Sequence, residues 1–200
     1  MSTPQLSREN ALKILEWKGI SLEKNPLILL GVRGYYLDTM GAEGKNDRGI
    51  YDDAFFWITP TSFISYNGNT DPSSYKKGQG FGSEKGMAML QIGKWWYKDG
   101  IHNGAKKSYP AFRQADDVTV IRDGKAKDYP HTGKFGINIH KGGVNTTSSE
   151  GCQTILPSQW DSFRSFGYEK IKQYKLKSFI YCLVDENDIR ESGVLKLIEK

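Results

Sequence analysis

Residues 136–154, GINIHKGGVNTTSSEGCQT, contain the two side-chain types that thiol chemistry requires. His140 ends a short β-branched segment, and Cys152 follows twelve positions later in a Gly- and Ser-containing turn. A thiolate is a far better nucleophile than a thiol, and a neighbouring imidazole can take the thiol proton and return it to a leaving amine. We therefore predict that Cys152 is a nucleophile and His140 its general base, with His102 and His131 as the alternative bases.

The turn that ends at Cys152 has a composition suited to stabilising an oxyanion. Gly151 can adopt backbone conformations closed to other residues, so the N–H groups of Gly151 and Cys152 are predicted to form the oxyanion hole. Ser149 either orients His140 or simply stabilises the turn, and both interpretations stay open. A Gly/Ser turn around a core cysteine is the simpler alternative, but it leaves the histidine-bearing strand unexplained.

His140, Ser149, Gly151 and Cys152 together resemble the catalytic signature of the L,D-transpeptidase family, a strand histidine followed after a loop by Ser/Thr-x-Gly-Cys. The resemblance implies a mainly β (α+β) fold, a mixed β-sandwich or barrel with a few peripheral helices. It also implies acyl transfer on peptidoglycan stem peptides through a thioester on the cysteine. Family members usually carry His before the Gly-Cys and Arg or Asn soon after it, whereas this chain has Glu150 and Gln153. The stretch is also similar to uncharacterised bacteriophage-encoded relatives of that family.

Four residues are predicted to contact the substrate: Arg33, Glu150, His102 and His131. In a polar loop that follows an apolar segment, Arg33 or Arg48 would pair with a stem-peptide carboxylate. The alternative is a solvated loop held by Asp–Arg pairs. Glu150 would set the imidazolium or bind a cationic group such as the side-chain amine of diaminopimelate.

The hydrophobic patterns predict one domain over residues 1–200, in which residues 1–30 form a helix and a first strand packed on it. Pro60 interrupts a strand pattern, and Asn67-Gly68, Asp99-Gly100 and Asp123-Gly124 are turn signals. Pro157 and Ser158 suit a helix start. The predicted helices are 7–18 and one after residue 158; the predicted strands are 27–32, 54–66 in two parts, 87–104, 118–122 and 177–185; the tail is a last strand or short helix.

The composition of the chain indicates which classes of binding partner to expect. The net charge is +5, but basic and acidic residues alternate along the chain, so an anionic cell wall satisfies the bias as well as nucleic acid does. We predict peptidoglycan stem peptides as the partner, no nucleic acid, no stable membrane insertion, no cofactor or metal, and a monomer. The two cysteines form no disulfide framework, and Cys182 lies in an apolar segment typical of the core.

The N-terminus shows no signal-peptide pattern. The expectation is synthesis in the cytoplasm and action in the periplasm or cell wall after lysis, pore release or injection, as for a phage lysis enzyme or an injected effector. This favours cleavage of stem-peptide amides over cross-linking. Two alternatives remain open: a zinc-dependent hydrolase using His102 or His131 with His140 and Cys152, although the usual ligand spacings are missing, and a non-enzymatic virion or wall-binding protein on the same fold.

Overall fold

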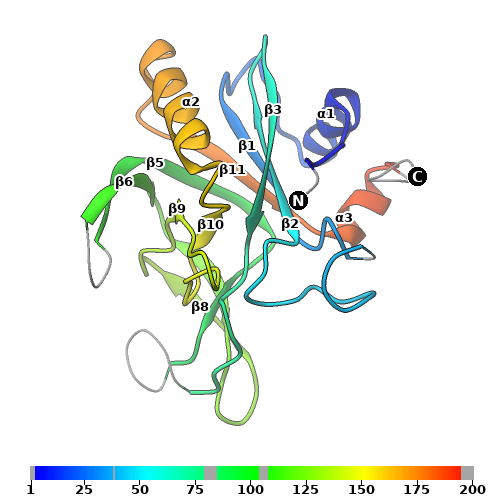
Figure 1. The fold of residues 1–200 in the computed structure, drawn as a ribbon. Helices are drawn as coiled ribbons and strands as arrows, with labels where there is room; N and C mark the ends of the chain where they lie inside the picture. The colour runs from blue at the N-terminus through cyan, green and yellow to red at the C-terminus, as the bar shows by residue number, and fades with distance from the viewer. Residues whose placement is uncertain (1–2, 38, 79–84, 104–107, 195–200) are drawn as a thin grey trace.

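The computed structural model describes residues 3–37, 39–78, 85–103 and 108–194. The described chain is mainly β with a few helices, which confirms the predicted fold class (Figure 1). The helices are α1 (Arg8–Trp17), α2 (Trp160–Gln173) and α3 (Glu186–Glu191). The strands are β1 (Ile28–Val32), β2 (Asp53–Ile58), β3 (Phe63–Asn69), β4 (Ala88–Leu90), β5 (Gly93–Asn103), β6 (Ser108–Gln114), β7 (Val118–Arg122), β8 (Tyr129–Gly133), β9 (Ile139–Lys141), β10 (Gln153–Ile155) and β11 (Phe179–Val184).

Eight strands form a closed sheet in the order β1-β11-β5-β6-β9-β10-β3-β2, in which β2 pairs again with β1. The pairs β1–β11 and β9–β10 are parallel, and the others are antiparallel. A second antiparallel sheet has the order β4-β7-β8. The backbone N–H of Ala88 in β4 donates to the carbonyl of Glu150 (2.9 Å), which attaches the small sheet to the loop before β10.

Strands β1, β2 and β11 bury both faces, and their alternate residues enter two different cores. On β1, Leu29 belongs to an aromatic-rich cluster with Trp57 and with Phe163 of α2. Its neighbour Leu30 faces a second, more aliphatic cluster that α1 and α3 complete. Figure 1 shows α2 on one side of β1–β3 and α1 and α3 on the other. This two-sided burial explains why β1 and β11 are apolar throughout.

The N-terminal helix forms as its sequence predicts. Ser7 is the N-cap, and its hydroxyl accepts the N–H of Asn10 at 3.1 Å. Ala11, Ile14 and Leu15 are buried and join the same cluster as β1 and α3. The predicted helix 7–18 is therefore correct to within one residue at each end.

Two of the predicted turns are wrong. Asn67-Gly68 lies inside β3, where Gly68 pairs with Asp53, and the chain reverses instead around Pro60, where the Thr59 hydroxyl accepts the N–H of Ser62 (2.9 Å). Gly68 is needed for close approach, because a Cβ there would lie 2.6 Å from the carbonyl oxygen of Thr154. Asp99-Gly100 likewise lies inside β5, paired with β6, and residue 104 at the end of the predicted strand lies outside the described residues.

The strand predicted over residues 87–104 is wrong as a single element, because β4 belongs to the small sheet and β5 to the closed sheet. The other sequence predictions for elements are confirmed. Asp123-Gly124 follows β7, which pairs with β8 as a hairpin. A helix follows residue 158, and residues 179–184 of the predicted last strand form β11. The tail forms the short helix α3, while residues 195–200 lie outside the described part of the chain. In that described part, no helix has the length and apolar character to cross a membrane.

Phe163 is the point where α2 and the closed sheet meet. Its ring lies within 6.3 Å of the rings of five other aromatic residues: Phe55, Trp57, Tyr66, Phe112 and Trp160. Phe163→Ala should lower the free energy of unfolding by about 3–5 kcal/mol, because a ring this enclosed leaves a cavity that cannot collapse. Chemical denaturation measures it, with the half-buried Phe166→Ala as the milder control. Equal losses for both variants would contradict this account of the core.

Candidate active site

The parallel pairing of β9 with β10 places the cysteine beside the histidine-bearing strand. His140 pairs with Thr154, and the N–H of Gln153 donates to the carbonyl of Asn138 at 2.8 Å. Cys152 therefore lies next to Asn138, whose N–H approaches the cysteine Sγ at 3.4 Å. Because side chains alternate along a strand, Asn138 and His140 project from the same face.

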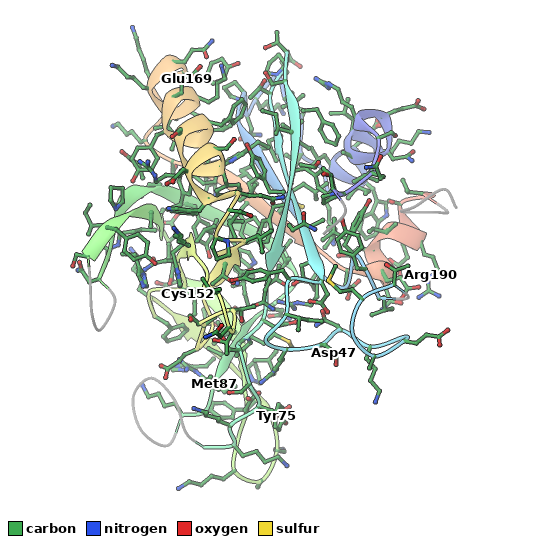
Figure 2. All side chains as sticks on the ribbon, viewed as in Figure 1. Asp47, Tyr75, Met87, Cys152, Glu169 and Arg190 are labelled. Atoms are coloured by element: carbon green, nitrogen blue, oxygen red, sulfur yellow. The ribbon has the colours of Figure 1, made fainter. Side chains whose placement is uncertain are left out.

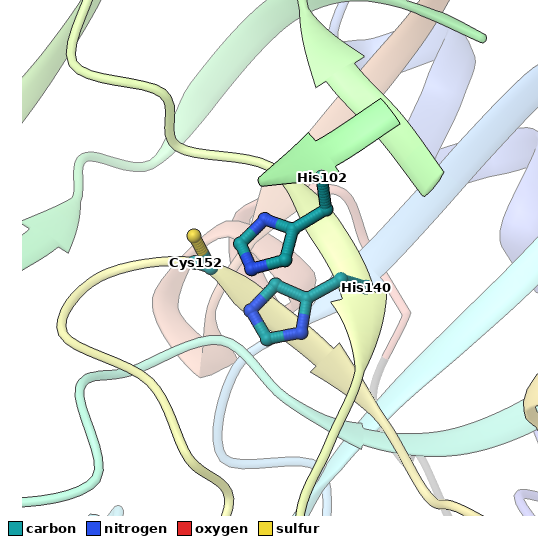
Figure 3. Close-up of side chains that lie close together, drawn as sticks. All are labelled: His102, His140 and Cys152. Atoms are coloured by element: carbon teal, nitrogen blue, oxygen red, sulfur yellow. The ribbon is translucent and has the colours of Figure 1, made fainter. Parts of the chain in front are cut away.

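A second histidine joins the pair from β5. The rings of His102 and His140 stack, with centroids 4.1 Å apart and planes inclined by 20°. One ring nitrogen of each histidine and the Sγ of Cys152 all lie within 4.8 Å of one another. Figure 3 shows the three side chains gathered together. The predicted approach of His140 to Cys152 is thus present in the structure, and His102 lies there as well.

Hydrogen bonds distinguish the two histidines. The Nδ1 of His140 lies 2.8 Å from the carbonyl of Lys141, so Nδ1 carries the proton and Nε2 keeps a lone pair. Tyr109 Oη also lies 3.1 Å from this Nδ1. The Nδ1 of His102 instead accepts from Nδ2 of Asn138 at 3.2 Å, which leaves the proton of His102 on Nε2. Nε2 of His140 can therefore accept a proton, and Nε2 of His102 can donate a hydrogen bond.

Both members of the candidate catalytic pair are neutral at rest. Burial raises the pKa of the Cys152 thiol to about 11; the Asn138 N–H opposes this shift, and the Glu150 charge adds to it. Burial lowers the pKa of His140 to about 4, with a further contribution from His102 and opposition from the Lys141 carbonyl. The thiol donates weakly to the carbonyl of Gly136 (3.4 Å). A thiolate–imidazolium pair is therefore not preformed.

The turn before Cys152 is held by Ser149. The Ser149 hydroxyl donates to the Cys152 carbonyl at 2.6 Å and accepts the Gly151 N–H at 2.9 Å. Of the two interpretations of Ser149, the structure shows turn stabilisation. Since the Gly151 N–H is already bonded, its predicted place in the oxyanion hole is wrong, and the Cys152 N–H stays a prediction. Gly151 is required because a Cβ would lie 2.5 Å from the carbonyl oxygen of Ala88, at a φ of 155°.

A cavity of about 620 Å³ opens over these side chains. Its lining carries both charge signs: the guanidinium groups of Arg113 and Arg122 and the carboxylate of Glu150. Figure 2 shows Cys152 between the closed sheet and the part of the chain that carries Met87 and Tyr75. The other lining residues are Ala88, Ile101, His102, Asn103, Phe135, Gly136, Ile137, Asn138, His140, Ser148, Gly151 and Cys152.

The structure corrects the interpretation of Arg33 as a substrate contact. Arg33 is buried and pairs with Asp71 at 3.2 Å, and it donates to the carbonyls of Thr70 and Leu90. Arg48 is bound by both carboxylate oxygens of Asp123, at 2.6 and 2.9 Å. Neither arginine lines the cavity. The Asp–Arg pairs of the alternative are therefore present, but Arg33 is buried and not solvated.

His131 lies apart from the cysteine. It is on β8, its ring lies 4.4 Å from that of Phe135, and its Nδ1 faces Nε of Arg122 at 3.4 Å. It is not among the cavity-lining residues, so it is neither the base nor a direct substrate contact in this structure. Glu150, by contrast, is exposed at the cavity, as its predicted role requires.

Sequence reasoning missed Asn138, Tyr109 and Arg122. Asn138 stands two positions before His140 in the alternating segment INIH, and that spacing placed it on the histidine face. Arg122 stands in register with the buried Val118 and Val120, so the alternation marked it as inward-facing. Tyr109 carries no such signal, because the β6–β9 pairing that brings it to His140 is long-range.

Comparison of the chain with protein-family models, curated proteins and solved structures gives no match.

The depressed pKa of His140 predicts an acid-sensitive fold. The unfolded imidazole titrates near pH 6.5 and the folded one near 4, so the unfolded state binds more protons between these values and stability falls as pH drops through that window. We expect about 2–3 kcal/mol of this loss at pH 4.5 to vanish in His140→Gln. Denaturation at pH 7 and 4.5 measures it, with His131→Gln as control; an unchanged pH dependence in His140→Gln would refute the assignment.

The raised pKa of Cys152 predicts slow alkylation at neutral pH. Since only the thiolate reacts, the rate with iodoacetamide should rise about tenfold per pH unit from pH 7 to 10. Cys152→Ala should remove the reaction, because Cys182 is buried and its pKa is raised to about 12. Mass spectrometry of the modified site gives the rate. A plateau near pH 7 would mean that the cysteine is already ionised.

Proposed function

We propose that this protein is a cysteine acyl-transfer enzyme that cleaves amide bonds in peptidoglycan stem peptides. The observation that carries the proposal is the meeting of Cys152 and His140 at the base of a cavity large enough for a peptide segment. The order of His140, Ser149, Gly151 and Cys152, which resembles the L,D-transpeptidases, supports peptidoglycan as the substrate. Action in the periplasm or cell wall is part of the same proposal.

The neutral resting pair sets how the first step proceeds. As Sγ attacks the amide carbon, its proton passes to Nε2 of His140, and the carbonyl π electrons move to oxygen. The new imidazolium is stabilised at Nδ1 by the Lys141 carbonyl. Proton transfer and attack must occur together, because a free thiolate at this site is costly.

The imidazolium of His140 then returns the proton to the leaving nitrogen as the C–N bond breaks, which leaves a thioester on Cys152. We expect the Cys152 N–H to donate to the oxyanion, with the Nε2–H of His102 as a second donor near the sulfur. Water attacks the thioester with His140 as base, and the thiol is regenerated. An amine in place of water would give transfer instead of cleavage.

A second candidate is a metal-dependent hydrolase, and one observation favours it. The ligand atoms of His102, His140 and Cys152 lie close enough together to hold one ion. Three protein ligands with an open position is the arrangement of catalytic zinc sites. His131 does not belong to this set, so only the His102 version of the zinc alternative fits. The stacked rings and the proton on Nε2 of His102 favour the thiol mechanism.

Digestion of purified sacculi, followed by mass spectrometry of released muropeptides, tests the function. Wild-type protein should shorten or uncouple stem peptides. Cys152→Ala should lose at least about 10³-fold in rate, and His140→Gln about 10²–10⁴-fold, because the base acts in both chemical steps. His102→Gln, which removes only a donor, should lose less than His140→Gln.

Reagents separate the alternatives in the same assay. Activity that survives EDTA and is abolished by a thiol reagent supports the cysteine mechanism, whereas loss in EDTA with recovery on adding zinc supports the metal site. Products that are joined stems with no shortened muropeptide would indicate transfer. Sacculi unchanged by the wild-type protein would overturn the peptidoglycan assignment and leave a binding protein on this fold.

A further inference from the structure

Arg122 is a buried cation at the wall of the candidate active site. It ends β7, its residue is 3% exposed, and it lines the same cavity as Cys152. Its strand neighbour across the small sheet is Ala88, whose N–H donates to the Glu150 carbonyl two residues before Cys152. The guanidinium is therefore held on the segment that borders the nucleophile.

The partners of Arg122 among the described residues are neutral. Nη1 donates to the Gly86 carbonyl at 3.1 Å, Nε donates to Nδ1 of His131 at 3.4 Å, and the guanidinium carbon lies 4.9 Å from the Phe135 ring centroid. Among the described residues, no carboxylate lies within 4.0 Å of the guanidinium, and Nη2 has no hydrogen-bond partner. Burial lowers the pKa of this side chain, as expected for a cation without a counter-ion.

Two other largely enclosed arginines are each paired with a carboxylate. Arg33 pairs with Asp71, and Arg48 pairs with Asp123. An unpaired buried charge destabilises the fold, because desolvation is not offset by an ion pair. Arg122 differs from Arg33 and Arg48 because it has no carboxylate partner among the described residues, and it lines the cavity. The missing anion is therefore expected from outside the chain.

We propose that Arg122 binds a carboxylate of the substrate, so that the enzyme selects peptides with a free carboxylate near the scissile amide. The proposal rests on the proposed function and adds the substrate feature that is recognised. A planar guanidinium suits a carboxylate, with two parallel N–H donors. His131 acts as a positioning residue: its Nδ1 accepts from Nε of Arg122 and so orients the fork. Arg113, exposed on the same cavity, adds positive potential.

Paired substrates test the proposal. Stem tetrapeptides are prepared with each carboxylate in turn converted to a carboxamide, and kcat/KM is measured for acid and amide forms. Wild-type enzyme should prefer the acid at one position by about 10- to 100-fold, as expected for a charge-assisted hydrogen-bonded pair. Arg122→Gln should reduce that ratio to near one, and Arg122→Lys should retain part of it. Arg113→Gln, the matched control, should retain most of it.

The acid-to-amide ratio is taken within each variant, so it does not depend on how much of the variant is folded. A ratio that stays the same in Arg122→Gln and in wild type, or a wild-type ratio of one at every carboxylate, overturns the Arg122 proposal while leaving the cysteine enzyme intact. A ratio that collapses equally in Arg113→Gln also overturns it, because general positive potential would then suffice.

A second measurement needs no turnover. N-Acetyl-D-alanine and N-acetyl-D-alaninamide are compared as protectants of Cys152 against iodoacetamide. Protection by the acid alone, lost in Arg122→Gln, supports the carboxylate subsite even if sacculi are not digested, in which case only the peptidoglycan function fails. Suppose that the enzyme digests sacculi but shows no acid preference. Equal protection by acid and amide, or protection by neither, then refutes the carboxylate subsite and leaves the peptidoglycan function intact.

Discussion

The parallel pairing of β9 with β10 is the constraint on which the site depends. Parallel neighbours usually need a long crossover, commonly a helix. Here the connection is only the loop between Lys141 and Gln153, and it must be held in shape by other parts of the chain. The Tyr51 hydroxyl donates to the Gly143 carbonyl at 2.6 Å. The Ser149 N–H donates to the Ser73 hydroxyl at 2.6 Å, and the Ser73 N–H donates to the Ser149 carbonyl at 2.7 Å. A loop without regular structure thereby becomes a fixed support for the cysteine.

The same pairing connects the site to the core. The side chain of Gln153, the residue after the cysteine, is fully buried and accepts from the Tyr181 hydroxyl at 2.8 Å. Tyr181 stacks against Phe55 within the aromatic cluster that α2 completes. Cys152 thus stands at the edge of a close-packed region, where low polarity keeps both thiol and imidazole neutral. In the proposed mechanism, the sulfur loses its proton only as it attacks a carbonyl carbon.

The sequence patterns correctly predicted the structural features that depend on residues close together in the chain. The helix capped by Ser7, the interruption at Pro60 and the Asp123-Gly124 hairpin follow from nearby residues alone, and so does the approach of His140 to Cys152 across a short loop. Asn67-Gly68 and Asp99-Gly100 failed as turn signals because strand pairing overrode the preference of each dipeptide. Arg33 failed for a related reason: its partner Asp71 is far along the chain, and only the fold shows that the pair is closed. The second histidine and Tyr109 reach the site through long-range β5–β6–β9 pairing, which no short motif encodes.

Ala88 connects the cysteine turn to Arg122. Its carbonyl oxygen would collide with any side chain at position 151, its N–H donates to the carbonyl of Glu150, and across the β4–β7 pair it is the register partner of Arg122. One short strand therefore sets the separation between the cationic wall and the sulfur. In the proposed enzyme, this fixed separation would select substrates by the distance between their carboxylate and the scissile amide.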